Sequence, residues 1–467
     1  MLLTIEKLIY GGDGLARLPA APSTDDAHGR GKAVFVPFVL AGEKVEATLT
    51  EQKPGFARAN ADSIIEPSVH RIQPGCQYYA RCGGCHYQHA SYEHQLEIKK
   101  EILRENLRRI AKLDLTCEIQ VHASPPWNYR NRSRLQVRTG PEFAVGYFKF
   151  ASHELLPVEE CPISSPLINR GIASLWEAGR NGKVVEGVQE VEFFANADDT
   201  KLLIELLCAP EARRAAFRAW AEDWRAAMPE ISGIAAFREP QKGVQEPLVA
   251  VGASELTYQT KGAAYRVSAG SFFQTNRFLI DELVDIVTAG PSGDLALDLY
   301  AGVGLFSTAL ACNFRHIVSV EMSQTAAADL KYNLPINGAS VQTAADQYLA
   351  ESIIGAATAR VGAGDSPAQS RSDGPRGRVG KSWVTPASLK PDLVVVDPPR
   401  SGLGDRVARA LASANAPRLT YVSCDPSTLA RDLIPLQAAG YRVEEVHLVD
   451  LFPQTYHLET VLQLVHG

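Results

Sequence analysis

The chain has 467 residues, of which 45% are hydrophobic and 21% are charged, with a formal net charge of −6. These values are ordinary for a folded globular protein, and the length predicts two to four domains because one hydrophobic core does not grow this large. The weak negative charge excludes a basic whole-protein field as the reason for binding nucleic acid, so such binding has to depend on local patches.

Residues 1–66 contain short strand-like runs separated by Gly and Pro, as in KAVFVPFVLAGEKVEATLTEQ. This spacing predicts a small β-barrel, a fold that often binds single-stranded nucleic acid. A barrel that only packs against the rest of the chain fits the pattern equally well. The segment lacks the residue order of a signal peptide, and no apolar run in the chain is long enough to span a membrane. We therefore expect a cytoplasmic protein.

Three of the eight cysteines are crowded in the next segment, as Cys76-x5-Cys82-x2-Cys85, and Cys161-Pro162 lies far downstream. The remaining cysteines are scattered, which indicates a reduced protein without a disulfide framework. Four cysteines, the last followed by proline, suit a [4Fe–4S] cluster, and structural zinc is the alternative. Because zinc ribbons usually carry two C-x2-C pairs, we favour the iron–sulfur cluster. Three further cysteines are predicted to lie in the core: Cys117, Cys208 and Cys312.

A helical period begins near Ser91, and FRAWAEDWRAAM predicts a second helix. Between them, WNYRNRSRLQVR carries four arginines at even spacing and no acid. On a strand these side chains would share one face. They are Arg130, Arg132, Arg134 and Arg138. With Trp127 and Tyr129 available to stack bases, this face is a candidate RNA contact, and a solvated strand face is the alternative.

From about residue 293 the chain alternates apolar strands with polar loops and helices, as in PDLVVVDPPRSGL and RLTYVSCDPSTLARDL. Near-continuous apolar runs indicate parallel strands buried on both faces, so we predict a doubly wound α/β sheet. Residues 361–391 are rich in Gly, Ser, Pro and Arg, and we interpret them as a flexible insertion or a long loop.

The segment DLYAGVG is predicted to place Gly302 and Gly304 between a strand and a helix, where glycine lets the backbone pass close to a ligand. Glu321 closes the next strand, where a carboxylate can accept the hydroxyls of a ribose. Because the motif is shorter than the pyrophosphate-binding fingerprint, we predict a nucleoside without a diphosphate, with S-adenosylmethionine as the common choice. A glycine turn beside a surface glutamate is the alternative.

Asp397 and Cys424 follow two further strands, so the topology brings them to the same sheet edge. Cys424 has three interpretations: a buried small hydrophobic residue, a metal ligand or a nucleophile. A methyl donor nearby favours the nucleophile, and amides of the following helix near Ser427 would lower its pKa. A thiolate that adds to C6 of uracil makes C5 nucleophilic, after which a base must remove the C5 proton. Glu459 is the candidate base, with a merely solvated glutamate as the alternative.

On these motifs the sequence resembles the RNA 5-methyluridine methyltransferases, the family of 23S ribosomal RNA uracil-C5 enzymes and their transfer-RNA T-loop relatives. The resemblance spans nearly the whole chain and implies a multidomain α/β protein. Residues 1–66 would form a TRAM domain, an OB-like RNA-binding barrel. Residues 67–265 would form an α+β domain with the iron–sulfur site and RNA-binding strands. Residues 266–467 would form a Rossmann-like methyltransferase domain.

The resemblance also implies the roles of single residues. The cluster ligands would be Cys76, Cys82, Cys85 and Cys161. Cys424 in YVSCDPSTLARDL would be the nucleophile, and Glu459 in HLETV the proton acceptor. The donor site would include Gln274 of GSFFQTN, Tyr300, Gly302, Gly304, Glu321, Asp397 and, toward the adenine, Asp346 of AADQYL.

We therefore expect a monomeric enzyme that methylates uridine C5 in structured RNA, using S-adenosylmethionine and carrying a [4Fe–4S] cluster. The target base would be flipped out of its stack. Ribosomal RNA is favoured as the substrate, and transfer RNA is the alternative. Two other functions stay open: an RNA-binding protein with a degenerate methyltransferase domain, and a methyltransferase that uses Asp-Pro-Pro to modify amino groups.

Overall fold

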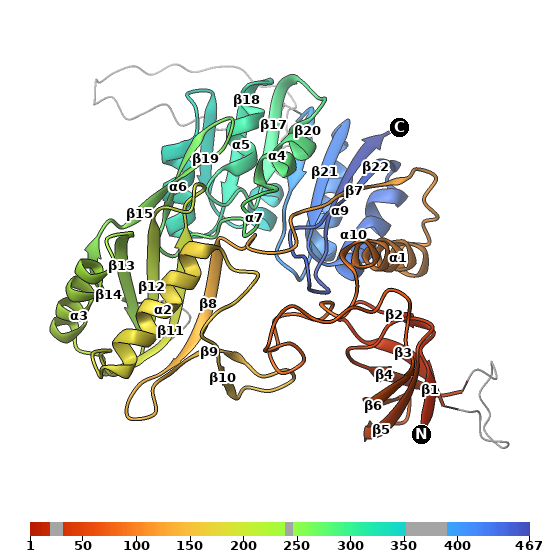
Figure 1. Ribbon diagram of the computed structural model, residues 1–467. Coiled ribbons are helices and arrows are strands. Elements are labelled where there is room, and N and C mark those ends of the chain that lie inside the picture. Colours follow the sequence, from red (N-terminus) through yellow and green to blue (C-terminus); the bar gives the residue numbers. More distant parts are fainter. Residues whose placement is uncertain (19–30, 239–245, 352–389) are drawn as a thin grey trace, which may run out of the picture.

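The computed structural model describes residues 1–18, 31–238, 246–351 and 390–467 (Figure 1). The insertion predicted at 361–391 falls almost wholly outside these residues. No helix in the described ranges is long and apolar enough to cross a membrane.

The N-terminal part is a six-stranded sheet in the order β1-β5-β6-β4-β3-β2. Along β5, buried and exposed residues alternate, so one face of the sheet packs a small core of its own around Val34, Val36 and Val45. The strands are β1 (Leu2–Thr4), β2 (Lys7–Leu8), β3 (Gly14–Arg17), β4 (Ala33–Val36), β5 (Lys44–Gln52) and β6 (Phe56–Glu66). We call this part the barrel; Figure 1 draws it in red below α1 and α10.

The middle of the chain forms a seven-stranded sheet in the order β10-β9-β8-β11-β12-β13-β14. Its strands are β8 (Arg132–Arg138), β9 (Ala144–Phe148), β10 (Leu155–Pro157), β11 (Val188–Ala195), β12 (Leu202–Cys208), β13 (Ile231–Arg238) and β14 (Glu246–Gly252). The helices α2 (Pro166–Arg180) and α3 (Arg214–Ala227) share an apolar core with this sheet, which includes Leu175, Phe193 and Trp224. The helix predicted from FRAWAEDWRAAM is therefore confirmed.

The C-terminal part is an eight-stranded sheet in the order β19-β18-β17-β20-β21-β23-β22-β7. The strands from β19 to β21 run parallel, whereas β23 is antiparallel to both its neighbours. The strands are β7 (Ile119–His122), β17 (Gly293–Leu299), β18 (Phe314–Glu321), β19 (Gly338–Gln342), β20 (Leu393–Val396), β21 (Arg418–Ser423), β22 (Tyr441–Val449) and β23 (Glu459–His466). The hairpin β15 (Glu255–Gln259) and β16 (Ala264–Ser268) precedes this sheet in the chain.

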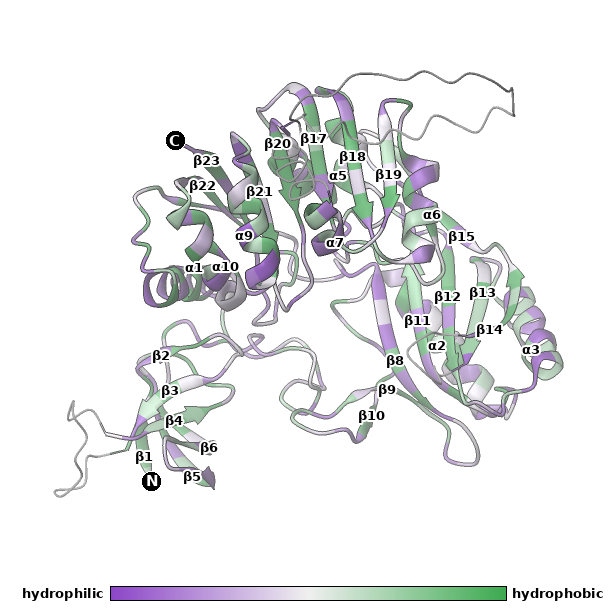
Figure 2. Cartoon of the chain, turned by 180° about the vertical axis from the view of Figure 1, so that it is seen from behind, coloured by the Kyte–Doolittle hydropathy of each residue, from purple (hydrophilic) through white to green (hydrophobic). Residues whose placement is uncertain are grey.

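Both faces of this sheet are covered by helices, as the continuous apolar runs predict. Leu295 and Leu297 of β17 join the core of α1, α9 and α10, whereas Ala296 between them joins the core of α4 and α5. The bounds are α1 (Tyr92–Ile110), α4 (Ile280–Thr288), α5 (Leu305–Leu310), α6 (Gln324–Asn333), α7 (Ala345–Leu349), α9 (Gly404–Ala414) and α10 (Pro426–Ala438). Figure 2 shows the resulting apolar colour of the middle strands. The doubly wound sheet is confirmed.

Two segments predicted to belong to the central part pack with the C-terminal sheet instead. Helix α1, which follows Ser91 as expected, buries Ile102 and Leu107 in the core of α9 and α10, and β7 pairs with β22. The expectation that Cys312 lies in a core is wrong, because its side chain is exposed; Cys208 is buried and Cys117 is partly buried.

Candidate active site

Predicted site residues from distant parts of the chain meet at one edge of the C-terminal sheet. Tyr300, Glu321, Asp397 and Cys424 stand at the carboxyl ends of four parallel strands. Glu459 reaches the same edge from the other direction, because β23 runs antiparallel and begins there. Ser423 pairs with Thr460. The next residues outward are Cys424 and Glu459, so the thiol and the carboxyl group adjoin across the last rung.

The ionisable groups at this edge influence one another electrostatically. Burial and the neighbouring Asp397 raise the pKa of Glu459 well above its ordinary value. Burial, and then Asp298, raise the pKa of Asp397 to about 7. Burial raises the pKa of the Cys424 thiol to about 12, and the charges of Glu459 and Asp397 add to the rise. Without RNA, the site therefore favours neutral acids and a protonated thiol.

The helix amides expected to lower the thiol pKa are already used. Asp425 is the N-cap of α10, and its Oδ1 accepts hydrogen bonds from the amides of Ser427 at 2.9 Å and Thr428 at 3.0 Å. These amides stabilise the carboxylate of Asp425, which itself raises the pKa of Cys424 slightly. Asp425-Pro426 therefore forms the start of the helix, with Pro426 in its first turn.

Two charged residues at this edge were missed from the sequence. Asp298 of β17 is fully buried, and burial raises its pKa to about 7. Its Oδ2 accepts from the Ser307 hydroxyl, whereas its Oδ1 has no partner among the described residues. Arg400 is exposed and lies near enough to oppose the rise in the pKa of both Cys424 and Glu459. Their positions in DLYAGVG and DPPR were the available signals.

The donor half of the edge has an open backbone turn. Gly302 has φ +56°, and a Cβ there would meet no atom within 4 Å. Glu321 accepts hydrogen bonds from the amides of Gly302 at 2.9 Å and Ser323 at 2.7 Å, so its carboxylate is fixed beside the turn. Tyr300 has φ 62°, an uncommon conformation for a residue with a side chain. These residues leave room for a small ligand next to an oriented carboxylate.

Asp346 lies near the turn, and Gln274 is buried. Burial raises the pKa of Tyr300 to about 12, and Asp346 adds to the rise, which places its carboxylate near Tyr300. Asp346 forms an ion pair with Arg406 at 3.2 Å. Gln274 is 8% exposed, and its amide makes no hydrogen bond to any described residue. A nucleoside with ribose hydroxyls and a charged tail has suitable partners here.

The four cysteines of the predicted cluster gather at one place. Burial raises the pKa of Cys85 and raises that of Cys82 to about 11; in both cases the other thiols, Cys161 included, add to the rise. The amide of Gly84 donates to the Cys82 sulfur at 3.4 Å. Amides directed at cysteine sulfur are also found around iron–sulfur clusters. No three His, Cys, Asp or Glu side chains in the described ranges are arranged to hold a metal ion, so the cluster stays a prediction.

The interpretation of the arginine-rich strand as an RNA contact is wrong for two residues. Arg132 is buried and forms ion pairs with Glu192 of the neighbouring β11 and with Glu205 of β12, the latter at 3.1 Å. Tyr129 is fully buried and donates to the carbonyl oxygen of Pro453 at 3.0 Å, so it cannot stack bases. Arg134 pairs with Glu192 at 2.8 Å. Arg130 lies near Cys161 and Cys85, where its charge offsets thiolates.

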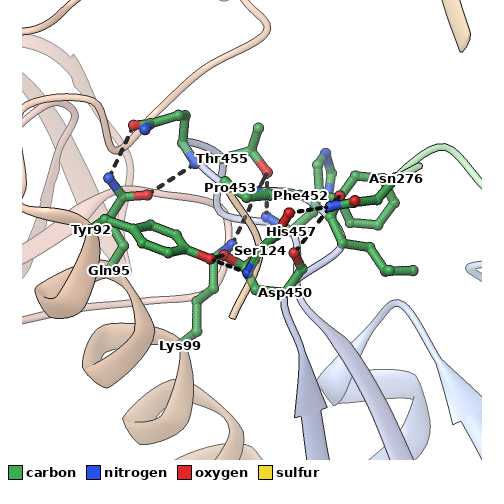
Figure 3. Close-up of polar contacts among 12 residues, drawn as sticks. Tyr92, Gln95, Lys99, Ser124, Asn276, Asp450, Phe452, Pro453, Thr455 and His457 are labelled. Atoms are coloured by element: carbon green, nitrogen blue, oxygen red, sulfur yellow. Dashed lines mark hydrogen bonds and ion pairs between the residues drawn. The ribbon is translucent and has the colours of Figure 1, made fainter. Parts of the chain in front are cut away.

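Residues 450–458 form the loop that leads to Glu459, and side chains of helix α1 hold this loop in place. Lys99 and Asp450 form an ion pair at 2.6 Å, and both side chains are fully buried. Tyr92 donates to the other oxygen of Asp450 at 2.9 Å, and Asn276 donates to the carbonyl oxygen of Leu451 at 3.1 Å. Figure 3 shows these side chains converging on the loop.

The same loop is also fastened to the cysteine segment. Gln454 exchanges two hydrogen bonds with Gln95, at 2.9 and 3.0 Å. Its carbonyl oxygen accepts from the amides of His86 and Tyr87, both at 2.9 Å. His86 directly follows Cys85, so these hydrogen bonds to Gln454 join the cysteine segment to the loop of residues 450–458.

Comparison with known proteins matches two family models to the chain. The model described as tRNA (uracil-5-)-methyltransferase matches residues 91–351 and 384–466. The TRAM domain model matches residues 1–61, which form the barrel.

Similar proteins extend over nearly the full length. An uncharacterized RNA methyltransferase of Aquifex aeolicus is 32% identical and covers 99% of this chain and 97% of the relative. One of Caldanaerobacter subterraneus subsp. tengcongensis is 31% identical and covers 92% of each. Among solved structures, the tRNA (uracil-54, C5)-methyltransferase of Pyrococcus abyssi in complex with S-adenosyl-L-homocysteine aligns over 100% of both chains, with a TM-score of 0.69 and 22% identity. This structure shares the fold.

Proposed function

Because the chain belongs to the tRNA (uracil-5-)-methyltransferase family and is an RNA methyltransferase, we propose that it methylates C5 of a uridine in structured RNA with S-adenosylmethionine. The observation that carries this proposal is the pairing of Ser423 with Thr460, which sets Cys424 against Glu459 at the edge of the sheet. A nucleophilic thiol and a carboxyl base are the two groups that C5 methylation of uracil requires.

In the first half of the reaction the Cys424 thiolate adds to C6 of uracil. The new C6–S bond moves an electron pair through C5 to the O4 enolate. S-adenosylmethionine supplies an electrophilic methyl group on a sulfonium, and C5 takes this group with its electron pair. Because the free thiol is held protonated, we expect its proton to leave only when the uracil and the nearby cation of Arg400 favour negative charge.

In the second half, Glu459, which has to be in its carboxylate form at this step, removes the C5 proton. The electron pair of the C5–H bond reforms the C5–C6 double bond and expels the thiolate. Burial raises the pKa of Glu459, which makes its carboxylate a stronger base than an exposed glutamate. The products are 5-methyluridine, the demethylated donor and one proton.

The donor site is proposed at the turn of Gly302. Glu321 would accept the ribose hydroxyls, Asp346 would face the adenine, and Gln274 would contact the methionine part. Tyr300, Gly304 and Asp397 complete the list of proposed donor contacts. The open space at Gly302 and the carboxylate of Glu321 fixed beside it support this placement.

A [4Fe–4S] cluster is proposed on Cys76, Cys82, Cys85 and Cys161. A cluster of this kind ties together segments distant in sequence, and no redox step is needed for the methylation. The mutual proximity of the thiols and the positive charge of Arg130 support it. Protein purified without oxygen is expected to be brown and to contain iron; colourless protein that contains zinc would contradict the assignment.

The RNA is proposed to be 23S ribosomal RNA, with transfer RNA as the alternative. The proposal is tested by incubating the protein with unmodified ribosomal and transfer RNA and with methyl-labelled donor, followed by mass spectrometry of the nucleosides. 5-Methyluridine in ribosomal RNA is the expected product. If it appears only in transfer RNA, the substrate assignment is wrong; if it appears in neither, the proposed function is wrong. Methylated adenine would instead support the amino-group alternative.

A further inference from the structure

The turn between β2 and β3 of the barrel touches the candidate nucleophile. The hydroxyl of Tyr10 donates a hydrogen bond to the carbonyl oxygen of Cys424 at 3.1 Å, although 414 positions separate the two residues. Tyr10 is half-buried and packs, with Leu8, against the core of α1 and α10. This contact fixes the peptide group between the nucleophile and Asp425, the N-cap of α10.

The same ring also contacts the segment that carries the candidate base. Tyr10 packs edge-on against Tyr456, with 5.5 Å between ring centroids and 89° between planes. Tyr456 in turn packs against His86 at 4.7 Å. Because Tyr456 lies just before Glu459 in the chain, one barrel side chain touches both catalytic segments.

The turn is built to hold Tyr10 in this place. Gly11 and Gly12 have φ +107° and +96°, which glycine adopts without strain. A Cβ on Gly12 would lie 3.1 Å from the Cβ of His86, so the turn sits closely on the cysteine segment. Lys7 forms an ion pair with Glu105 of α1, which anchors the strand before the turn.

The phenol of Tyr10 stays a hydrogen-bond donor throughout the working pH range. Burial raises its pKa above the ordinary value, and Asp425, Tyr456 and Cys424 add to the rise. A neutral hydroxyl can therefore hold the Cys424 carbonyl group whether the thiol is protonated or not.

We propose that Tyr10 is a positioning residue of the catalytic centre, through which the barrel orients the Cys424 thiol and the Tyr456–Glu459 segment. This inference depends on the proposed function, since it assigns Tyr10 to the thiolate addition step. Small errors in the distance between a nucleophile and its target lower rates strongly, so a fixed carbonyl group beside the thiol has a kinetic effect. The barrel is then part of the active site in addition to being an RNA-binding module.

The test measures adduct formation with an RNA transcript, methylated by the wild type, in which 5-fluorouridine replaces uridine. Fluorine at C5 cannot leave as a cation, so the C6–S bond persists after methyl transfer and the adduct survives denaturing electrophoresis. Tyr10→Phe is expected to lower the rate of adduct formation about three- to tenfold, since it removes one hydrogen bond. The RNA dissociation constant and the melting temperature should remain unchanged. Tyr10→Leu, which also removes the ring, is expected to lower the rate further.

Lys7→Met is the matched control, because it loosens the same interface without touching Cys424 or Tyr456. Its adduct rate is expected to stay within about twofold of the wild type, because the pair is partly open to solvent and contributes little to stability. A Tyr10→Phe rate equal to the wild type overturns the inference. An equal loss in Lys7→Met also overturns it, since the interface as a whole would then set the rate.

A second readout needs no RNA. Iodoacetamide labelling of Cys424, measured by peptide mass spectrometry relative to the exposed Cys312, is expected to become several-fold faster in Tyr10→Phe because the peptide group is released. An unchanged ratio contradicts the role of the hydrogen bond. If the wild type makes no 5-methyluridine, the proposed function fails, and the labelling ratio still decides whether Tyr10 controls Cys424.

Discussion

At the scale of single residues, the site is a set of acids kept neutral by burial. Asp298, Asp397, Glu459 and Cys424 all have raised pKa values in the absence of RNA. Neutral neighbours lessen the repulsion that a thiolate would otherwise meet. Ionisation of the thiol therefore depends on nearby positive charge, and Arg400 is the protein group that opposes the rise in its pKa.

Replacement of the candidate nucleophile separates chemistry from binding. Cys424→Ala is expected to abolish 5-methyluridine formation while the affinity for S-adenosylmethionine stays within about twofold, since the donor turn is on another strand. Calorimetric titration with the donor and nucleoside mass spectrometry check the two parts. A variant that loses donor binding would mean that Cys424 is a structural residue.

Replacement of the candidate base should stop the reaction halfway. In Glu459→Gln, thiolate addition and methyl transfer remain possible, but the C5 proton stays and the C6–S bond persists. We expect a methylated protein–RNA adduct on denaturing gels and at least a hundredfold loss of free product, about the effect of losing a general base. Cys424→Ala/Glu459→Gln is the control, because it should form no adduct. A Glu459→Gln enzyme that turns over normally excludes this base.

Stability should depend on pH through Asp298. Its pKa is about 7 in the folded protein against 3.8 for the ordinary group, so the folded state binds the proton more tightly. The contribution of Asp298 to the free energy of unfolding is therefore fully present below pH 3.8. It is lost as pH rises through 7, because the buried carboxylate then has to form. Asp298→Asn is therefore expected to raise the melting temperature at pH 8 more than at pH 5. The exposed Asp294→Asn on the same strand should show no such difference.

At the scale of elements, the strands and the sheet edge with the site could be predicted, because short local sequence patterns determine where each strand begins and ends. The run Leu393–Val396 is apolar throughout since both faces are covered, and β20 has these bounds. Strand ends then determine where Asp397 and Cys424 lie. The arginines of β8 show the limit: their acidic partners Glu192 and Glu205 come from β11 and β12, which no local pattern could pair with Arg132.

The buried Lys99–Asp450 ion pair fastens helix α1 to the loop of residues 450–458. Removing one member leaves a buried charge without a partner. Lys99→Met is expected to lower the free energy of unfolding by about 3–5 kcal/mol, whereas Lys99→Met/Asp450→Asn should recover most of this loss. Urea denaturation measures both. Lys100→Met, next to Lys99 and paired only with the exposed Glu97, is the control. Equal effects of the two single variants would contradict a special role for the buried pair.

At the scale of the whole molecule, the barrel, the cysteine segment and the sheet meet at one centre. The loop before Glu459 receives hydrogen bonds from His86 and Tyr87, and the barrel reaches Cys424 through Tyr10. These contacts span almost the full chain, so the sequence could predict the three parts separately and could not predict that they share an active site.

Loss of the proposed cluster should therefore loosen the loop that precedes the candidate base, Glu459. Cys85→Ser is expected to remove the visible absorbance and to accelerate amide hydrogen exchange in residues 450–458. Cys312→Ser, at an exposed position, should change neither property. Unchanged exchange in a Cys85→Ser protein that has lost its iron would mean that the cysteine segment does not support the loop.

The pairing of β7 with β22 has a consequence for biosynthesis. Ile119 pairs with Val446, so this edge strand is translated long before the strand that it pairs with. Lys99 is likewise translated long before Asp450, its partner in the buried ion pair. Such non-local pairings form late and slowly. A nascent chain that has not yet reached β22 and β23 therefore exposes the apolar face of α1 and lacks the assembled sheet edge that holds Cys424 and Glu459.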